Sequence, residues 1–375
     1  MTKDVIFALG VLMMVPMCTG CGGNANVDSL RSPGIDTANG SSDSSGGMKR
    51  LILLTNGFSP FWEAGRVGVE DADKELLEGT NLTASLEPND GTVSGQINKL
   101  RQYAAQGDVA GVAISITDAA NAALSDEMKR LAKKGAFILT VDSDMDREKF
   151  RDARFAYLGT DNRVGGQVLG TCAKHLRPDG GKYVTFVGRS GAQNAIERVS
   201  GFEEGAGNKF DNLDNMIDEE DRTRARENAR NAIRNHPALN VVAGIWSYNA
   251  PAIVDAVKEL DKRDEMTVVC FDAEPLAIKH MSDGMIDALV VQNPYQMGYQ
   301  SIRLLKALID DDQGTIQEML PNHTDPEGDI YDTGLKVIVP DTDSPLKPDM
   351  FGDNVEFLKI SEFSAWLDKY NLTGS

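Results

Sequence analysis

The chain has 375 residues, of which 41% are hydrophobic and 25% charged, so it is long enough for about two globular domains with large apolar cores. Its formal net charge of −19 at pH 7 argues against a nucleic-acid partner, because an acidic surface repels a phosphate backbone. Its four cysteines, Cys18, Cys21, Cys172 and Cys270, form neither a paired zinc-ligand motif nor a disulfide scaffold, and we expect Cys172 and Cys270 to be small buried side chains.

The first residues have the pattern of an export signal. An apolar run over 5–17 is too short to cross a membrane as a helix but has the length of the apolar region of a signal peptide. Small residues precede Cys21, as in a bacterial lipobox, so we expect a signal peptide over 1–21 and lipidation of Cys21. Residues 22–47 are rich in Gly, Ser, Asn and Asp and predict a flexible tether. The protein is therefore expected in the periplasm or on the outer face of the cell envelope, anchored by lipid.

From residue 51 onward, short apolar runs alternate with amphipathic segments. The run Leu51–Thr55 has no polar alternation, which is typical of a parallel strand buried on both faces, whereas 61–77 carries the apolar stripe of a helix. Strict alternation predicts an α/β fold with parallel sheets, and the number of strands predicts two doubly wound lobes. The expected strands are 51–55, 82–86, 109–116, 137–141, 155–158, 182–187, 241–246, 267–271 and 288–292, and the expected helices are 61–77, 96–105, 119–134, 164–175, 195–209, 224–235, 251–260, 274–283 and 296–309.

The residues just after each strand are the candidate binding residues, because doubly wound sheets bind ligands beyond the carboxyl ends of their strands. They combine carboxylates, amides, an arginine and aromatic rings. Sugar hydroxyls both donate and accept hydrogen bonds, and the apolar face of a sugar ring packs on an aromatic ring, so this mixture suits a neutral polyhydroxylated ligand. The candidates are Asn56, Ser59, Phe61, Trp62, Asp142, Ser143, Asp144, Arg198, Asp221, Tyr248, Asn249, Asp272 and Gln292.

Several of these residues also have structural alternatives. Asp142 and Asp272 could cap the helices that follow them, and Trp62 could belong to the core. Arg198 could be a surface charge of its helix, and the acidic loop around Asp221 could be a solvated surface.

Catalytic patterns are missing from the sequence. Gly188-Arg189-Ser190-Gly191 is not a nucleophile elbow, no H-E-x-x-H motif occurs, and the four histidines lie away from the expected strand ends. Asp142 and Asp144 leave glycoside chemistry as the one enzymatic alternative. We expect no enzyme, no catalytic residue, no metal site and no cofactor.

Six motifs follow one another over about residues 49–339: Asn56–Trp62, Leu139–Asp144, Tyr157–Asn162 with Gly165 and Gly166, Glu197–Phe202, Val268–Asp272, and Ala288–Pro294 with Gly298. In this order they resemble the ribose/galactose-type periplasmic sugar-binding proteins of ABC transporters. The resemblance implies the type I periplasmic binding protein fold and assigns Arg198, Asp272 and Gln292 to the ligand. The altered positions Ser143, Asp144 and Tyr248 imply a ligand other than ribose.

The same resemblance implies how the chain is divided and what it does. The N-terminal lobe is expected to be 48–160 plus 293–325 and the C-terminal lobe 161–292 plus 326–343, with hinge crossings near 158–162, 291–295 and 320–336. Residues 344–375 form an extension in which 357–370 is spaced like an amphipathic helix that packs on the body.

The expected function is capture of a monosaccharide or polyol between the lobes by a monomer that delivers it to an ABC permease. The alternative is presentation of the ligand to a receptor kinase or chemoreceptor. A transcription regulator of the same fold would need an N-terminal helix-turn-helix, where this sequence has the export signal.

Overall fold

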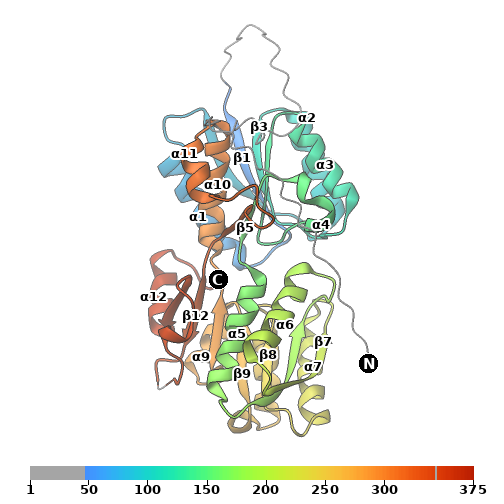
Figure 1. The fold of residues 1–375 in the computed structure, drawn as a ribbon, viewed down its shortest axis with the longest axis vertical. Coiled ribbons are helices and arrows are strands. Elements are labelled where there is room, and N and C mark those ends of the chain that lie inside the picture. The colour runs from blue at the N-terminus through green and yellow to red at the C-terminus, as the bar shows by residue number, and fades with distance from the viewer. Residues whose placement is uncertain (1–46, 343) are drawn as a thin grey trace, which may run out of the picture. The chain divides into compact units, whose positions relative to one another are not determined.

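The computed structural model describes residues 47–342 and 344–375 (Figure 1). The predicted signal peptide, the lipidation site Cys21 and nearly all of the predicted tether lie outside the described residues. Within the described part of the chain, no helix combines the length and apolar character needed to cross a bilayer.

The first sheet shows why its leading strand is apolar at successive positions. Leu51 and Leu53 pack in one core with α1 and α10, whereas Ile52 and Leu54 pack in a second core with α2 and α3, because successive side chains of a strand point to opposite faces. All six strands run parallel in the order β11-β5-β4-β3-β1-β2. The strands are β1 (Lys49–Leu54), β2 (Leu82–Glu87), β3 (Val109–Ile114), β4 (Phe137–Val141), β5 (Tyr157–Gly159) and β11 (Ile330–Asp332), and the helices are α1 (Phe61–Leu76), α2 (Val93–Gln106), α3 (Ala122–Ala132), α4 (Arg147–Phe150), α10 (Pro294–Ile309) and α11 (Gln313–Met319).

The second sheet repeats this arrangement and adds two strands. Its order is β13-β12-β10-β9-β8-β6-β7, and only the β10–β12 pair is antiparallel. The strands are β6 (Gly181–Val187), β7 (Phe210–Ile217), β8 (Val241–Gly244), β9 (Thr267–Phe271), β10 (Ala288–Val291), β12 (Leu335–Val339) and β13 (Val355–Lys359), and the helices are α5 (Asn162–Leu176), α6 (Gln193–Ala206), α7 (Arg222–Asn235), α8 (Asn249–Glu259), α9 (Pro275–Ser282) and α12 (Ile360–Lys369).

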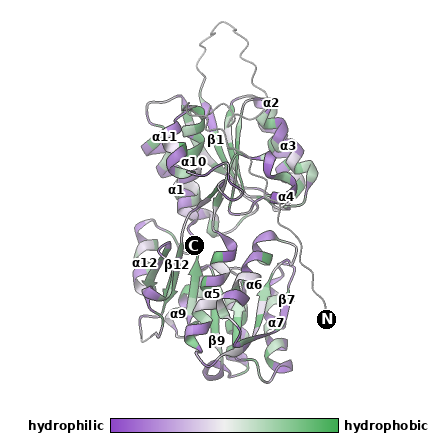
Figure 2. Cartoon of the chain, viewed as in Figure 1, coloured by the Kyte–Doolittle hydropathy of each residue, from purple (hydrophilic) through white to green (hydrophobic). Residues whose placement is uncertain are grey.

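Both lobes share one topology. The orders β2-β1-β3-β4-β5 and β7-β6-β8-β9-β10 are the same doubly wound order, in which β4 and β9 hold equivalent places. The predicted α/β fold with two doubly wound lobes is therefore confirmed. Hydrophobic residues concentrate in the strands, while the helices also carry hydrophilic residues (Figure 2).

Three crossings join the sheets, and the third divides the lobes later than the expected boundary between residues 325 and 326. The chain leaves the first sheet after β5, returns through Gln292 and Asn293 between β10 and α10, and leaves again at Thr333 and Gly334 between β11 and β12. The expected division placed all of 326–343 in the second lobe, but β11 pairs with β5 and so belongs to the first sheet.

Two other expectations about elements need correction. The predicted helix over 357–370 begins as strand β13, which pairs with β12, so only Ile360–Lys369 is helical. Strand β7 was missed because it is an edge strand whose residues are mostly exposed, so it lacks an apolar run.

Candidate functional site

A cavity of about 540 Å³ lies at the carboxyl ends of strands from both sheets. Ten of the thirteen residues predicted as ligand contacts line this cavity, and they come from six separate stretches of the chain. They are Asn56, Ser59, Phe61, Trp62, Asp142, Ser143, Arg198, Tyr248, Asp272 and Gln292.

The remaining wall is formed by residues that were not predicted, among them Phe58, Thr117, Arg189, Asn194, Glu220, Arg222, Trp246, Glu274 and Ser375.

Asp142 and Asp272 occupy equivalent places in the two lobes. Each directly follows the equivalent strand, β4 or β9, and each has a left-handed backbone, with φ of 61° and 60°. Aspartate is one of the few residues that adopts this conformation readily, and it turns the chain sharply at the strand end. Neither side chain caps a helix: Asp146 caps α4, and the residue before α9, Glu274, makes no side-chain cap.

These two carboxylates are buried and share one cation. Ser115 Oγ donates to Asp142 at 3.0 Å, and Gln292 Nε2 donates to both oxygens of Asp272 at 3.2 and 3.1 Å. Burial raises the pKa of Asp142 to about 6, against the opposing charge of Arg198 and the Ser115 hydrogen bond. Burial likewise raises the pKa of Asp272, again opposed by Arg198. The site therefore holds two carboxylates that are poorly compensated until further donors reach them.

Arg198 is held in place by contacts with four residues. It is 2% exposed, its Nε donates to Asn162 Oδ1 at 2.9 Å, and its Nη1 donates to the carbonyl of Ile245 at 3.3 Å. Its guanidinium lies 4.1 Å from the ring centre of Phe271 and 4.0 Å from the Asp272 carboxylate. This arrangement fits a fixed donor in the cavity wall and excludes a surface charge.

Aromatic rings line the cavity from both lobes. Trp62 is both a core residue and a wall residue: its ring packs in the first core, and its Nε1 donates to Asn56 Oδ1 at 3.1 Å. Phe61 meets it edge to face at 5.0 Å. Trp246 and Tyr248, 6.4 Å apart, line the cavity from the second lobe.

Four buried polar atoms of wall residues have no hydrogen-bond partner among the described residues. Buried polar atoms are nearly always paired, so these four atoms are available to hydrogen-bond a ligand or water in the cavity. One is a donor, one is a hydroxyl and two are acceptors: Trp246 Nε1, Thr117 Oγ1, Asn194 Oδ1 and Gln292 Oε1.

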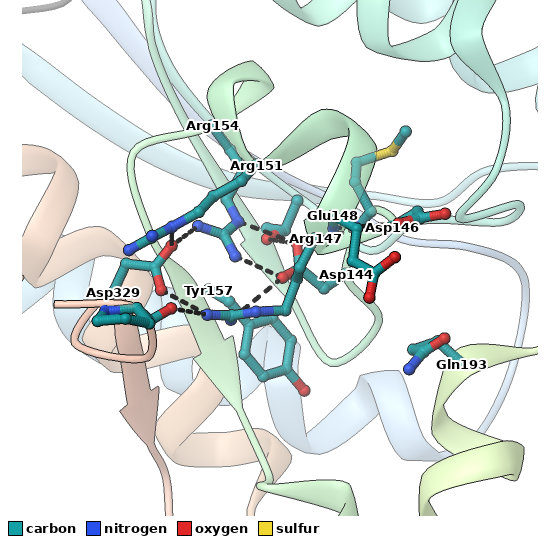
Figure 3. A network of polar contacts seen from close by, with 12 residues as sticks. Asp144, Asp146, Arg147, Glu148, Arg151, Arg154, Tyr157, Gln193 and Asp329 are labelled. Carbon is teal, nitrogen blue, oxygen red and sulfur yellow. Dashed lines mark hydrogen bonds and ion pairs between the residues drawn. The ribbon is translucent and has the colours of Figure 1, made fainter.

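Asp144 does not reach the cavity, contrary to expectation. Its carboxylate accepts from Arg154 Nε at 2.9 Å and Nη2 at 2.5 Å, and from Thr140 Oγ1 at 2.6 Å. Arg154 also pairs with Asp329, which Arg147 and Arg151 contact as well (Figure 3). Asp144 thus belongs to an ion network that ties the loop after β4 to the segment before β11.

Asp221 and Asn249 also lie off the cavity wall. Asp221 is exposed and caps α7, accepting from the backbone N–H groups of Thr223 and Arg224. Asn249 is fully buried; its Oδ1 accepts from Trp246 N at 3.0 Å and its Nδ2 donates to Asp218 at 2.9 Å. Asn249 therefore supports the loop that presents Trp246 and Tyr248.

Two ion pairs of the second lobe lie in the cavity wall. Arg189 pairs with Glu220 at 2.8 Å, and both Nη atoms of Arg222 donate to Glu274 at 3.0 Å. These pairs leave little free charge for an ionic ligand. The sequence did not predict these ion pairs because the two partners of each pair lie in different segments of the chain.

A second cavity, of about 600 Å³, lies at the opposite end of the second sheet, near the first residues of β6 and β9. Its arginines are already engaged: Arg177 donates to Thr267 and to the carbonyl of Glu265, and Arg263 pairs with Asp287. We therefore place the candidate site in the first cavity, where polar atoms remain unpaired.

Within residues 47–342 and 344–375, no group of three or more His, Cys, Asp and Glu side chains is arranged to hold a metal ion. Cys172 and Cys270 are buried, as expected, and both are free thiols; burial raises the pKa of Cys270 to about 12.

Comparison with known proteins adds the family. Residues 51–313 match the model described as "Periplasmic binding protein domain". The D-allose-binding periplasmic protein of Escherichia coli is 25% identical over 68% of this chain and 82% of its own length. The ribose import binding protein RbsB of Salmonella typhimurium is 28% identical over 43% of this chain, and the match spans only 54% of that relative.

A solved structure agrees with the fold. The ABC transporter solute-binding protein of Burkholderia graminis, in complex with D-arabinose, superposes with a TM-score of 0.68 at 22% identity, over 79% of this chain and 96% of that one. At this identity the likeness supports the fold alone.

Proposed function

The chain belongs to the periplasmic binding protein domain family, and we propose that it is the substrate-binding component of an ABC-type importer, which captures a monosaccharide or polyol in the 540 Å³ cavity. Membership in a family of binding domains confirms the expectation that the protein is not an enzyme.

The unpaired polar atoms of the cavity wall are the observation that carries the proposal. A sugar hydroxyl both donates and accepts, so several hydroxyls can satisfy the Trp246 Nε1 donor and the Gln292 and Asn194 acceptors in one bound molecule. Other hydroxyls can donate to the carboxylates of Asp142 and Asp272, which burial leaves short of donors.

The charge balance favours a neutral ligand. The wall carries four acids, Asp142, Glu220, Asp272 and Glu274, and three arginines, Arg189, Arg198 and Arg222. The Arg189–Glu220 and Arg222–Glu274 ion pairs are each neutral overall. The charged side chains that remain in the wall are Asp142, Asp272 and Arg198. A phosphorylated or acidic sugar would face these two carboxylates in a buried place.

The three crossings support a hinge mechanism. We propose that ligand binds first to one lobe and that rotation about 160–161, 292–293 and 333–334 closes the other lobe over it. Ser143 and Tyr248 line the cavity and differ from the family pattern, so the proposed ligand remains one other than ribose. Asp144 no longer supports that inference, because it lies in the ion network.

We also propose that the protein is a monomer anchored through lipidated Cys21. Mass spectrometry of protein from a bacterial envelope fraction tests this, with Cys21→Ser as the control. An unmodified N-terminal peptide containing Cys21 would contradict lipidation.

Isothermal titration calorimetry with a panel of pentoses, hexoses and polyols tests the proposed function. We expect one sugar or polyol to bind with a Kd in the micromolar range or tighter, which corresponds to about −8 kcal/mol. Trp246→Phe removes one unpaired donor and keeps an aromatic ring, so we expect it to weaken binding about tenfold. Failure of every compound to bind the wild-type protein would contradict the proposal.

A further inference from the structure

Residues 371–375 fold back onto the turn that carries Asp272. Ser375 N donates to the carbonyl of Ala273 at 3.0 Å, and Ala273 N donates to the carbonyl of Ser375 at 2.8 Å. Ala273 directly follows Asp272, so this reciprocal pair fixes the segment beside a carboxylate of the candidate site. Ser375 is 4% exposed and forms part of the cavity wall.

Ser375 contacts the second crossing, and Tyr370, which directly precedes the segment, contacts the helix that follows this crossing, α10. Ser375 Oγ donates to the carbonyl of Gln292 at 3.4 Å, and the ring of Tyr370 lies 5.0 Å from that of Tyr295 on α10. The helix that precedes the segment, α12, is anchored by packing, because its residues Ile360, Phe363 and Leu367 are buried in the core of the second lobe. The segment therefore contacts the backbone of Gln292, whose side-chain Oε1 is one of the unpaired wall atoms.

Gly374 makes this close approach feasible. A Cβ at this position would lie 2.7 Å from the carbonyl oxygen of Ala273 and 3.1 Å from Cδ of Pro275. Neither neighbour is a flexible side chain, so a larger residue must push the segment away from Ala273. Gly352 offers a control, since a Cβ there meets nothing within 4 Å.

We propose that residues 372–375 are a specificity-determining wall of the ligand site, which limits how far a ligand extends toward Gln292 and aims Gln292 Oε1 at one ligand hydroxyl. This inference rests on the proposed function of the cavity. The segment lies outside the family match at 51–313.

Calorimetry of wild type, Gly374→Ala, Ser375→Ala and Gly352→Ala against the same sugar panel tests the inference. For Gly374→Ala we expect about tenfold weaker binding of the preferred sugar and a changed rank order among the others. Gly352→Ala should match wild type. Removal of residues 372–375 gives the same readout if Gly374→Ala fails to fold.

Two results overturn the inference while leaving the proposed function intact: unchanged binding by Gly374→Ala, or equal weakening for every sugar, which indicates a merely structural role. A wild-type protein that binds no sugar overturns the proposed function, and this inference falls with it.

Discussion

Asp272→Asn separates ligand binding from folding at the centre of the site. The substitution keeps the side-chain shape and the tolerance for a left-handed backbone, and it removes the charge that lies 4.0 Å from Arg198. A hydrogen bond to a charged group contributes about 1.5–3 kcal/mol, so losing the carboxylate should weaken sugar binding roughly 10- to 100-fold. Because burial already disfavours the charged form, we expect the free energy of unfolding to change by less than about 1 kcal/mol.

Calorimetry and urea unfolding of the same preparations measure both quantities. Asp221→Asn is the matched control: it is also a loop aspartate, but it caps α7 outside the cavity, so its sugar affinity should stay within about twofold of wild type. Wild-type affinity in Asp272→Asn would refute the assignment of this carboxylate to the ligand. A similar loss in both variants would point to a general effect of these loops.

Three further predictions follow from buried charges and caps. Burial raises the folded-state pKa of Asp142 to about 6, so the free energy of unfolding of the ligand-free protein should fall by at most roughly 3 kcal/mol as pH rises between about 4 and 6. Urea unfolding at several pH values should show that Asp142→Asn lacks this fall. A pH profile identical to that of wild type would contradict the prediction. Asp329→Asn should lower the free energy of unfolding by about 3 kcal/mol, because three arginines surround that buried carboxylate; a loss below about 1 kcal/mol in urea would contradict the network. Asp221→Ala should cost about 1 kcal/mol of stability through the lost α7 cap, with sugar affinity unchanged, and a calorimetric loss of binding would return Asp221 to the site.

Most central strands were predictable because each is buried on both faces and therefore apolar at successive positions, but β12, which is equally buried, was not among the expected strands. Edge strand β7 and the short strand β11 were not, since their residues are exposed or few and their pairing is set by distant segments. The same distinction holds for the extension, where β13 forms only through its ladder with β12.

The expectation that ligands bind beyond the carboxyl ends of the strands located the cavity, but it did not predict which other side chains each residue contacts. It located Asp142 and Asp272, whose backbone turn is set locally by the strand end. It misplaced Asp144, because its partner Arg154 arrives after an intervening helix, and it missed Ser375, which reaches the wall only by folding back over about a hundred residues.

A crystal structure of the protein with its tightest-binding sugar or polyol tests the central claim most directly. The account predicts one ligand in the 540 Å³ cavity, with hydroxyls within hydrogen-bond distance of Asp142, Arg198 and Asp272 and of the unpaired Gln292 Oε1. A ligand bound elsewhere, or one that contacts only a single lobe in the closed protein, would contradict it.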